Sequence, residues 1–189
     1  MQTTPCPNIL AFIEGTMERA FVNINFPKID VIPVFNGNTW TTYRLCEQII
    51  TKFRAKNTYP AQVVVWIDRE ENPDDSGVIA QSVRNAFADA GYPAAKVHCL
   101  IPDRMSENII LADEDVIREE IGDQLYTYGF EGQNGKHHLK TLLSAVDKPY
   151  KETTHGPKLL KKIRLSRART NSPSVDLFLS TFPLNCWWT

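Results

Sequence analysis

The sequence has no run of about 18 apolar residues, which is the length that a membrane-spanning helix needs. Its first residues, MQTTPCPNILAFIEG, also lack a basic stretch followed by a long apolar segment. A secretory signal peptide would show that pattern. We therefore expect a cytoplasmic protein that does not associate with membranes.

Cysteine is scarce, and net charge is nearly absent. The four cysteines among 189 residues are widely spaced and form no C-x-x-C pair, so a disulfide framework is not expected. Lys and Arg number 21 against 22 Asp and Glu, for a formal net charge of -1. The molecule as a whole therefore does not attract nucleic acid, and any such affinity must come from a local basic patch, a metal site or a partner.

Neither of the common Gly-rich phosphate loops occurs, because the sequence contains no G-x-G-x-x-G and no G-x-x-x-x-G-K-S/T. A phosphohydrolase that acts on a small nucleotide therefore ranks behind the other functions considered below. The composition itself, with 42% hydrophobic and 23% charged residues, is typical of a globular protein. At this length we expect one domain that spans residues 1–189.

Short apolar runs alternate with helical patterns over residues 1–103. The runs predict strands at 8–13, 29–35, 62–67 and 97–101, and the patterns between them predict helices from residues 17, 41 (or 39) and 78. Continuous apolar strands with short connections favour an α/β fold: a parallel sheet of about four strands with helices on both faces. Pro33 cannot donate to a strand ladder, so the second strand is expected at an edge.

Residues 104–189 lose the strand pattern. Helical spacing recurs at 107–120, 136–146, 156–165 and 173–182. We expect this C-terminal half to be a helical extension that packs on the sheet.

Acidic residues follow two of the predicted strands. Glu14 ends the first strand and Asp68 ends the third, and ligands of open parallel sheets bind at the carboxyl ends of the strands. Glu18 lies one helical turn after Glu14, and Glu70 lies two residues after Asp68. Four carboxylates so close repel one another unless cations are present, and hard oxygen ligands select Mg²⁺ or Mn²⁺. The alternative is that such acids are only helix caps or solvated loop residues.

A basic run lies late in the chain. It consists of Lys158, Lys161, Lys162, Arg164, Arg167 and Arg169. Such a concentration of positive charge in a nearly neutral protein is typical of a surface that follows phosphates, although a basic helix can also be a solvated face.

Several motifs together give the sequence a family resemblance. The segments I-E-G-T-x-E at 13–18 and W-I-D-R-E at 66–70 resemble the Toprim (topoisomerase–primase) fold, and in particular the small Toprim-like proteins of the RloB type found in bacterial defence loci. Three later segments are also similar to elements of that family: SENIILAD at 106–113, GPK at 156–158 and RTNSPS at 169–174. These segments cover most of the chain in the family's order.

The resemblance implies a metal-dependent nuclease that cuts DNA or RNA, with an ATPase as a possible partner. It implies that Glu14 is a metal ligand or general acid–base and that Asp68 is the main ligand. Glu18 and Glu70 would complete the ligand shell. Two further acids, Glu107 and Asp113, would serve a second ion, and Lys158 would neutralise charge on the phosphate undergoing attack.

Two positions depart from the family pattern. The usual Asp-x-Asp is Asp68-Arg69-Glu70 here, and the large aromatic residue expected after Glu107 is replaced by Asn108-Ile109. These departures leave open a non-catalytic function, in which a Toprim-like subunit docks on an ATPase and regulates it. The terminal pair Trp187-Trp188 suits such docking, although it could equally fold back on the core.

Overall fold

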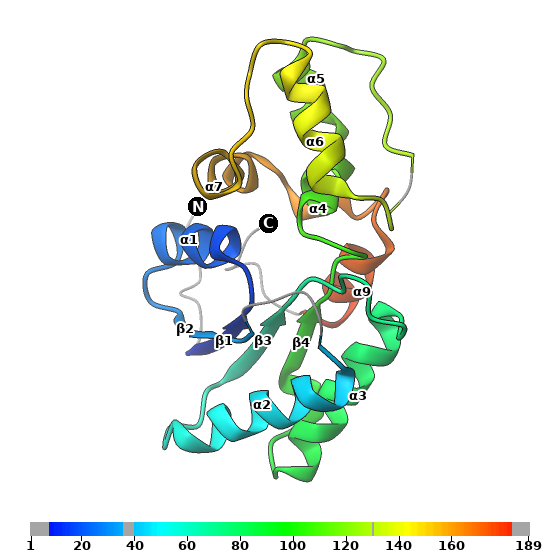
Figure 1. The fold of residues 1–189 in the computed structure, drawn as a ribbon. Coiled ribbons are helices and arrows are strands. Elements are labelled where there is room, and N and C mark those ends of the chain that lie inside the picture. The colour runs from blue at the N-terminus through cyan, green and yellow to red at the C-terminus, as the bar shows by residue number, and fades with distance from the viewer. Residues whose placement is uncertain (1–7, 36–39, 130, 183–189) are drawn as a thin grey trace.

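The computed structural model describes residues 8–35, 40–129 and 131–182. At its centre is a four-stranded parallel sheet with the strand order β2-β1-β3-β4 (Figure 1). The strands are β1 (Ile9–Ile13), β2 (Asp30–Pro33), β3 (Gln62–Trp66) and β4 (Val97–Leu100). The predicted α/β class is confirmed, and so is the position of β2, with its Pro33, at an edge. The alternative cap Thr39 and the pair Trp187-Trp188 lie outside the described residues.

Three helices connect the strands. They are α1 (Thr16–Asn25), α2 (Thr42–Ala55) and α3 (Ser76–Asp89), and a short 3₁₀ turn, η1 (Ala94–Lys96), precedes β4. The side chain of Thr41 caps α2 by accepting a hydrogen bond from the backbone of Arg44. Asp75 caps α3 in the same way by accepting from Val78.

The second half of the described chain is helical, as predicted. Its helices are α4 (Glu107–Ala112), α5 (Glu114–Ile121), α6 (Gly135–Ser144), α7 (Glu152–Lys162), α8 (Leu165–Ala168) and α9 (Pro173–Thr181). The sequence predicted one helix over 107–120, but the backbone of Asp113 leaves the helical region (φ -86°, ψ 82°) and divides it into α4 and α5. None of the described helices has both the length and the apolar character needed to cross a bilayer.

Each face of the sheet has its own apolar core. Because strand residues point alternately to the two faces, Leu10 and Phe12 pack with α2 and α3, whereas Ile9 and Ile13 face the opposite side. On that opposite side α1 and the helical extension complete the second core. Figure 1 shows α4, α5, α6 and α7 gathered beyond the carboxyl ends of the strands, so the extension stands over the edge where ligands of such sheets bind.

Candidate functional site

The two strands that carry the predicted acids are neighbours. Ile13 of β1 is paired with Trp66 of β3, and the backbone N–H of Glu14 donates to the Trp66 carbonyl at 3.2 Å. Glu14 and Asp68 therefore leave adjacent strands at the same end of the sheet. This adjacency, which the sequence argument assumed, is what lets their side chains share one space.

That space is a pocket of about 480 Å³, which we call the acid pocket. Of the six predicted metal ligands, five line it: Glu14, Glu18, Asp68, Glu70 and Glu107. They come from the ends of β1 and β3, from the first turn of α1 and from the start of α4. The structure thus brings together side chains that are up to 93 positions apart in the sequence.

Burial raises the pKa of all five of these carboxyl groups. It is the largest cause that raises the pKa of Glu14 to about 7, and the charges of Glu70 and Glu18 add to the effect. Burial also raises the pKa of Glu18, which is only 4% exposed, to about 7. The pKa values of Asp68, Glu70 and Glu107 are raised too, in each case mainly by burial. Ionising these groups together in a buried space is unfavourable, and a bound cation would stabilise their ionised forms.

The donor set fits a hard divalent cation. All five predicted ligands offer carboxylate oxygens, and the buried Oε2 atom of Glu14 has no hydrogen-bond partner in the described structure. Within the described ranges, however, no three His, Cys, Asp or Glu side chains already stand in positions suited to a metal ion. The acids therefore share the pocket without converging on one point, and a cation would have to draw their side chains inward.

Glu18 occupies its place because residue 15 is a glycine. A Cβ atom at Gly15 would lie 1.7 Å from Oε2 of Glu18, so any other residue there would displace this carboxylate. The backbone of Gly15 is extended (φ -69°, ψ 158°), which means that the glycine provides space and not an unusual conformation. The glycine of the E-G-x-x-E segment thus leaves the space that the second glutamate of the segment occupies.

A buried hydroxyl orients Asp68. Ser106 donates to Oδ1 of Asp68 at 2.6 Å and accepts from the indole Nε1 of Trp66 at 3.0 Å. Tyr150 does the same for Glu107, since its hydroxyl donates to Oε1 at 3.1 Å. The sequence argument missed Ser106 as part of the site, although it lies within the SENIILAD segment, and it had no signal for Tyr150.

Glu70 reaches the pocket from a strained backbone. Its φ is +53°, and Arg104 on the opposing loop has a φ of +68°. The N–H of Glu70 donates to the Arg104 carbonyl at 2.8 Å, which holds the two loops together. A positive φ at a non-glycine residue costs about 1–3 kcal/mol and persists where the surroundings impose it. With this backbone conformation, Glu70 lines the acid pocket.

The basic side chains of the acid pocket are ones that the sequence argument did not select. Lys136, at the start of α6, and Arg104 line it. Lys136 forms an ion pair with Glu152, an additional acid in the first turn of α7, and Arg104 pairs with Glu71. Because α6 and α7 are far from the sheet in sequence, only the tertiary structure reveals Lys136 and Glu152.

Asp113 does not line the acid pocket, although the resemblance implied that it would serve a second metal ion. Its carboxylate is fully buried, and Arg167 binds both of its oxygens, at 2.8 and 2.7 Å. The backbone N–H of Arg164 donates to it as well. Asp113 thereby ties the break between α4 and α5 to the start of α8, and its oxygens are already occupied.

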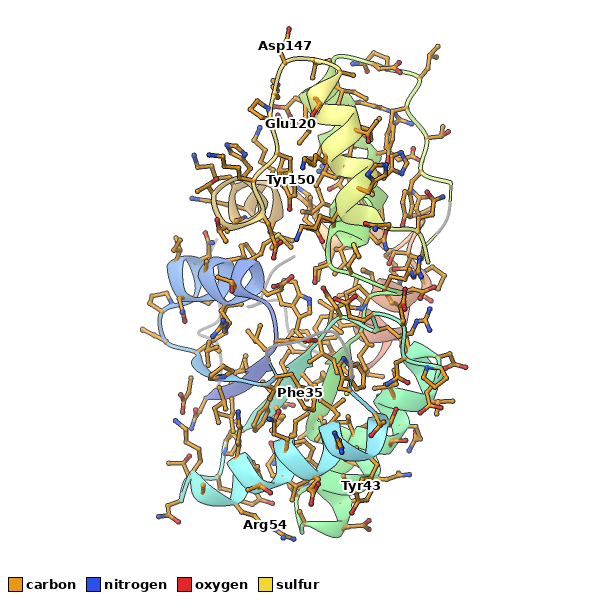
Figure 2. All side chains as sticks on the ribbon, in the orientation of Figure 1. Phe35, Tyr43, Arg54, Glu120, Asp147 and Tyr150 are labelled. Atoms are coloured by element: carbon orange, nitrogen blue, oxygen red, sulfur yellow. The ribbon has the colours of Figure 1, made fainter. Side chains whose placement is uncertain are left out.

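Lys158 is likewise not brought to the acid pocket, although the resemblance implied a catalytic role for it. It is exposed and lines a separate hollow of about 430 Å³ with Glu120 and Asp147. Figure 2 labels these two acids in the helical extension, away from the sheet. Lys158 therefore does not line the pocket that holds the acids.

Half of the basic run is already paired with acids. Lys162 binds Glu120, Arg167 binds Asp113 and Arg169 binds Asp176. In the described part of the chain the other three, Lys158, Lys161 and Arg164, form no ion pair between side chains and are exposed. The run is thus partly structural, and three cations remain available for an acidic partner.

Comparison with known proteins places the chain in a family. The sequence profile of a family described as a domain of unknown function, DUF4276, matches residues 11–182. No curated protein matches the sequence. Among solved structures, the C-terminal region of the Burkholderia pseudomallei OLD protein is similar over 90% of this chain and 91% of that one, with 15% identity and a TM-score of 0.35. Neither comparison names an activity, so the function is argued from the acid pocket.

Proposed function

The chain belongs to the DUF4276 family, and we propose that it is a metal-dependent nuclease that hydrolyses phosphodiester bonds in DNA or RNA. One observation carries the proposal: five carboxylates from four segments line one pocket at the carboxyl ends of adjacent parallel strands. Burial without a cation raises the pKa of every one of them. The Toprim resemblance of the same residues supports the assignment.

In this proposal Glu14 and Asp68 hold Mg²⁺ or Mn²⁺, and Glu18, Glu70 and Glu107 complete the ligand shell. The bound ions supply an activated water and offset the charge that develops on the scissile phosphate. The protein contributes position: Ser106 fixes Asp68, Tyr150 fixes Glu107, and Gly15 leaves room for Glu18. Preorganised charges of this kind provide most of the acceleration of phosphoryl transfer.

Lys136 takes the phosphate-contacting role that the resemblance gave to Lys158. Its ammonium group stands at the acid pocket, bonded to Glu152, and the charges of Glu107 and Glu70 act on it. Exchange of Glu152 for a phosphate oxygen would let Lys136 bind the substrate. Lys158 provides the matched control, because it is a lysine on the same extension that does not line this pocket.

Cleavage assays test the proposal. Purified protein is incubated with plasmid, linear DNA and tRNA, with Mg²⁺ or Mn²⁺ and then with EDTA. We expect metal-dependent cleavage that Glu14→Gln or Asp68→Asn lowers by about a hundredfold or more, because a metal ion contributes several kcal/mol of transition-state stabilisation. Lys136→Ala should lower the rate as well, and Lys158→Ala, outside the acid pocket, should lower it far less. Cleavage that survives Asp68→Asn would refute the assignment of the site.

A second candidate is a non-catalytic subunit that docks on an ATPase and regulates it. The observation in its favour is that the acids of the described structure do not yet converge on a metal position. Size-exclusion chromatography with the product of the neighbouring gene separates the two functions. A stable complex without metal-dependent cleavage would favour docking, whereas cleavage by the isolated chain would favour the nuclease.

The biological setting that we propose is a bacterial anti-phage defence system in the cytoplasm, in which an ATPase controls the nuclease. The RloB-type resemblance supports this setting. An ATPase encoded beside the gene, together with loss of phage protection in the Asp68→Asn variant, would be the expected result.

A further inference from the structure

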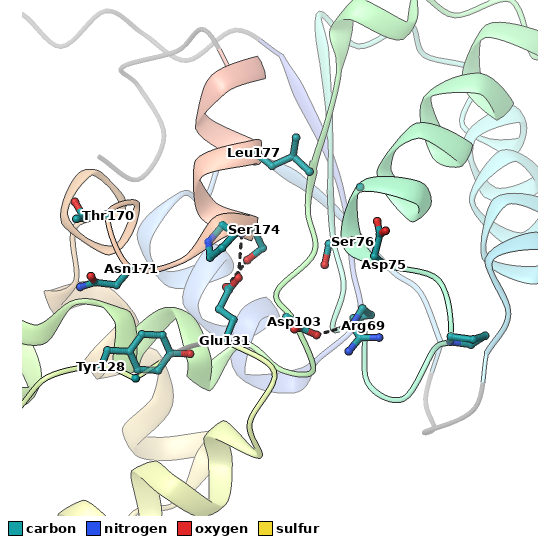
Figure 3. A pocket seen from close by; sticks show the side chains of 14 residues that line it. Arg69, Asp75, Ser76, Asp103, Tyr128, Glu131, Thr170, Asn171, Ser174 and Leu177 are labelled. Atoms are coloured by element: carbon teal, nitrogen blue, oxygen red, sulfur yellow. Dashed lines mark hydrogen bonds and ion pairs between the residues drawn. The ribbon is translucent and has the colours of Figure 1, made fainter.

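A second and larger cavity, of about 720 Å³, opens beside the acid pocket, and we call it the side pocket. The segment Asp68-Arg69-Glu70 separates the two: Asp68 and Glu70 line the acid pocket, and Arg69 lines the side pocket. Its other walls come from the start of α3, from Asp103 after β4, from the loop before α6 and from the start of α9 (Figure 3). A nucleic-acid strand bound at the acid pocket would therefore have a second cavity next to it, on the other side of Arg69.

The side pocket contains a buried hydroxyl that lacks a partner. Tyr128 is 7% exposed, and no described residue forms a hydrogen bond with its Oη atom. Its backbone is fixed, because its N–H donates to Glu114 at 2.9 Å. In Figure 3 its ring points toward the space between Glu131 and Asp103. An unpaired buried hydroxyl costs about 1–3 kcal/mol, and a ligand that accepts a hydrogen bond would remove this cost.

Two carboxylates of the side pocket offer acceptor oxygens near Tyr128. Glu131 is held at the start of α9, where Oε1 accepts from the hydroxyls of Ser172 and Ser174 and Oε2 accepts from the backbone N–H of Ser174 at 3.0 Å. Since a carboxylate oxygen accepts about two hydrogen bonds, Oε2 retains one free position. Asp103 offers a further oxygen, because Arg69 occupies only Oδ1, at 2.5 Å.

These charges disfavour a phosphate and favour a neutral group with N–H donors. Glu131, Asp103 and Asp75 line the side pocket against one cation, Arg69, which is already paired. The N-terminus of α9, which would otherwise attract an anion, is occupied by Glu131. Apolar surface from Pro173 and Leu177 completes the lining, as is usual for sites that take a flat ring.

We propose that the side pocket binds a nucleobase of the substrate strand, specifically a base with an exocyclic amino group, such as adenine, cytosine or guanine. The amino group donates to Glu131 Oε2 or to Asp103, and a ring nitrogen or carbonyl of the base accepts from the Tyr128 hydroxyl. This inference rests on the proposed function, since it takes the strand to be the one cut at the acid pocket. It makes the enzyme selective for the base beside the scissile bond.

Binding of nucleosides in EDTA tests this inference without cleavage. Adenosine, cytidine and uridine are titrated into the full chain, and binding is followed by NMR chemical-shift changes. We expect adenosine and cytidine to bind more tightly than uridine, which lacks the amino group. Because the measurement needs neither metal nor the acid pocket, it succeeds or fails independently of the nuclease assays.

Two tyrosine variants provide the matched pair. Tyr128→Phe removes only the unpartnered hydroxyl, so it should weaken adenosine binding about three- to tenfold without lowering the melting temperature. Tyr126→Phe is the control: its hydroxyl donates to the carbonyl of Leu111 at 3.2 Å and does not line the side pocket. It should lower the melting temperature and leave binding unchanged. Absence of nucleoside binding, equal binding of uridine, or wild-type affinity in Tyr128→Phe would each overturn the inference.

Discussion

Ser106 donates a 2.6 Å hydrogen bond to Oδ1 of Asp68 and so fixes the carboxylate that stands at the end of the central strand β3. The same oxygen of Ser106 accepts from Trp66, a residue of that strand, so strand and acid are linked through one hydroxyl. All three groups come from the region where β3 meets the start of α4. The position of Asp68 therefore depends on the packing of the extension against the sheet.

Replacement of Ser106 tests this dependence. Ser106→Ala frees Asp68 to rotate and removes the hydroxyl that accepts from the buried indole N–H of Trp66. We expect the affinity for Mn²⁺ to fall about 10- to 100-fold, as for other groups that orient a metal ligand. The free energy of unfolding should fall by about 1–3 kcal/mol. Titration with Mn²⁺ and urea unfolding measure the two effects.

The control for this variant is Ser172→Ala. Ser172 is equally buried and caps α9 by accepting from Val175, but its hydroxyl donates to Glu131 and not to a carboxylate of the acid pocket. It should lower stability and leave Mn²⁺ affinity unchanged. Equal affinity losses in the two variants would show that Ser106 acts through general stability and not through Asp68.

The raised pKa values of Glu14 and Glu18 predict a pH dependence of stability. In the folded chain both titrate near 7, above the value of 4.5 that they have when exposed. The stability that their protonated forms provide is therefore complete below pH 4.5 and is lost as the pH rises through 7. In EDTA, the melting temperature of the wild type should fall from pH 5 to pH 8 more than that of a Glu14→Gln/Glu18→Gln variant.

Cations should reverse this loss. Mn²⁺ competes with protons for the same oxygens, so it should raise the melting temperature more at pH 8 than at pH 5. Parallel pH profiles of the wild type and the double variant would contradict the pKa assignments. An equal effect of Mn²⁺ on both proteins would place the ion elsewhere.

Gly15→Ala should disable Glu18 without unfolding the chain. The new methyl group would occupy the position that Oε2 of Glu18 now holds, while the backbone of residue 15 suits alanine. We expect Mn²⁺ affinity to fall about tenfold or more. Gly77→Ala is the control, because residue 77 lies in the first turn of α3 and does not line the acid pocket. An affinity in Gly15→Ala equal to that of the wild type would exclude Glu18 as a ligand.

Asp113→Ala should affect stability and not metal binding. It removes a fully buried carboxylate that accepts from Arg167 and from the backbone of Arg164. Because the Arg167 side chain is 35% exposed and can be solvated, the cost is that of the lost hydrogen bonds, about 1–3 kcal/mol, which urea unfolding would detect. A selective loss of Mn²⁺ affinity, with stability intact, would restore Asp113 to the metal site.

Sequence reasoning reached the sheet and most of the acid pocket because both follow from local patterns. Continuous apolar runs such as QVVVW identify strands, and an acid directly after a strand falls at the carboxyl end of a parallel sheet. Glu14 and Asp68 could therefore be identified from the sequence alone. Glu107 was found only through its resemblance to a family motif.

The sequence did not reveal which distant segments contact one another. Asp113 belongs to the same motif as Glu107, but α4 carries it to the other end of the helix, where Arg167 binds it. Lys158 and Lys136 are indistinguishable by local pattern, and only the packing of α6 and α7 decides which of them reaches the acids. Tyr150 and Ser106 act through single hydroxyl groups that sequence spacing does not reveal.

The most direct test of the account is the binding of Mn²⁺ to the metal-free chain at pH 8, followed by electron paramagnetic resonance. The account predicts saturable binding by the wild type, a large loss of affinity in Glu14→Gln and Asp68→Asn, and wild-type affinity in Lys158→Ala. Binding that persists unchanged in Asp68→Asn, or no saturable binding by the wild type, would contradict the assignment of the acid pocket as a metal centre.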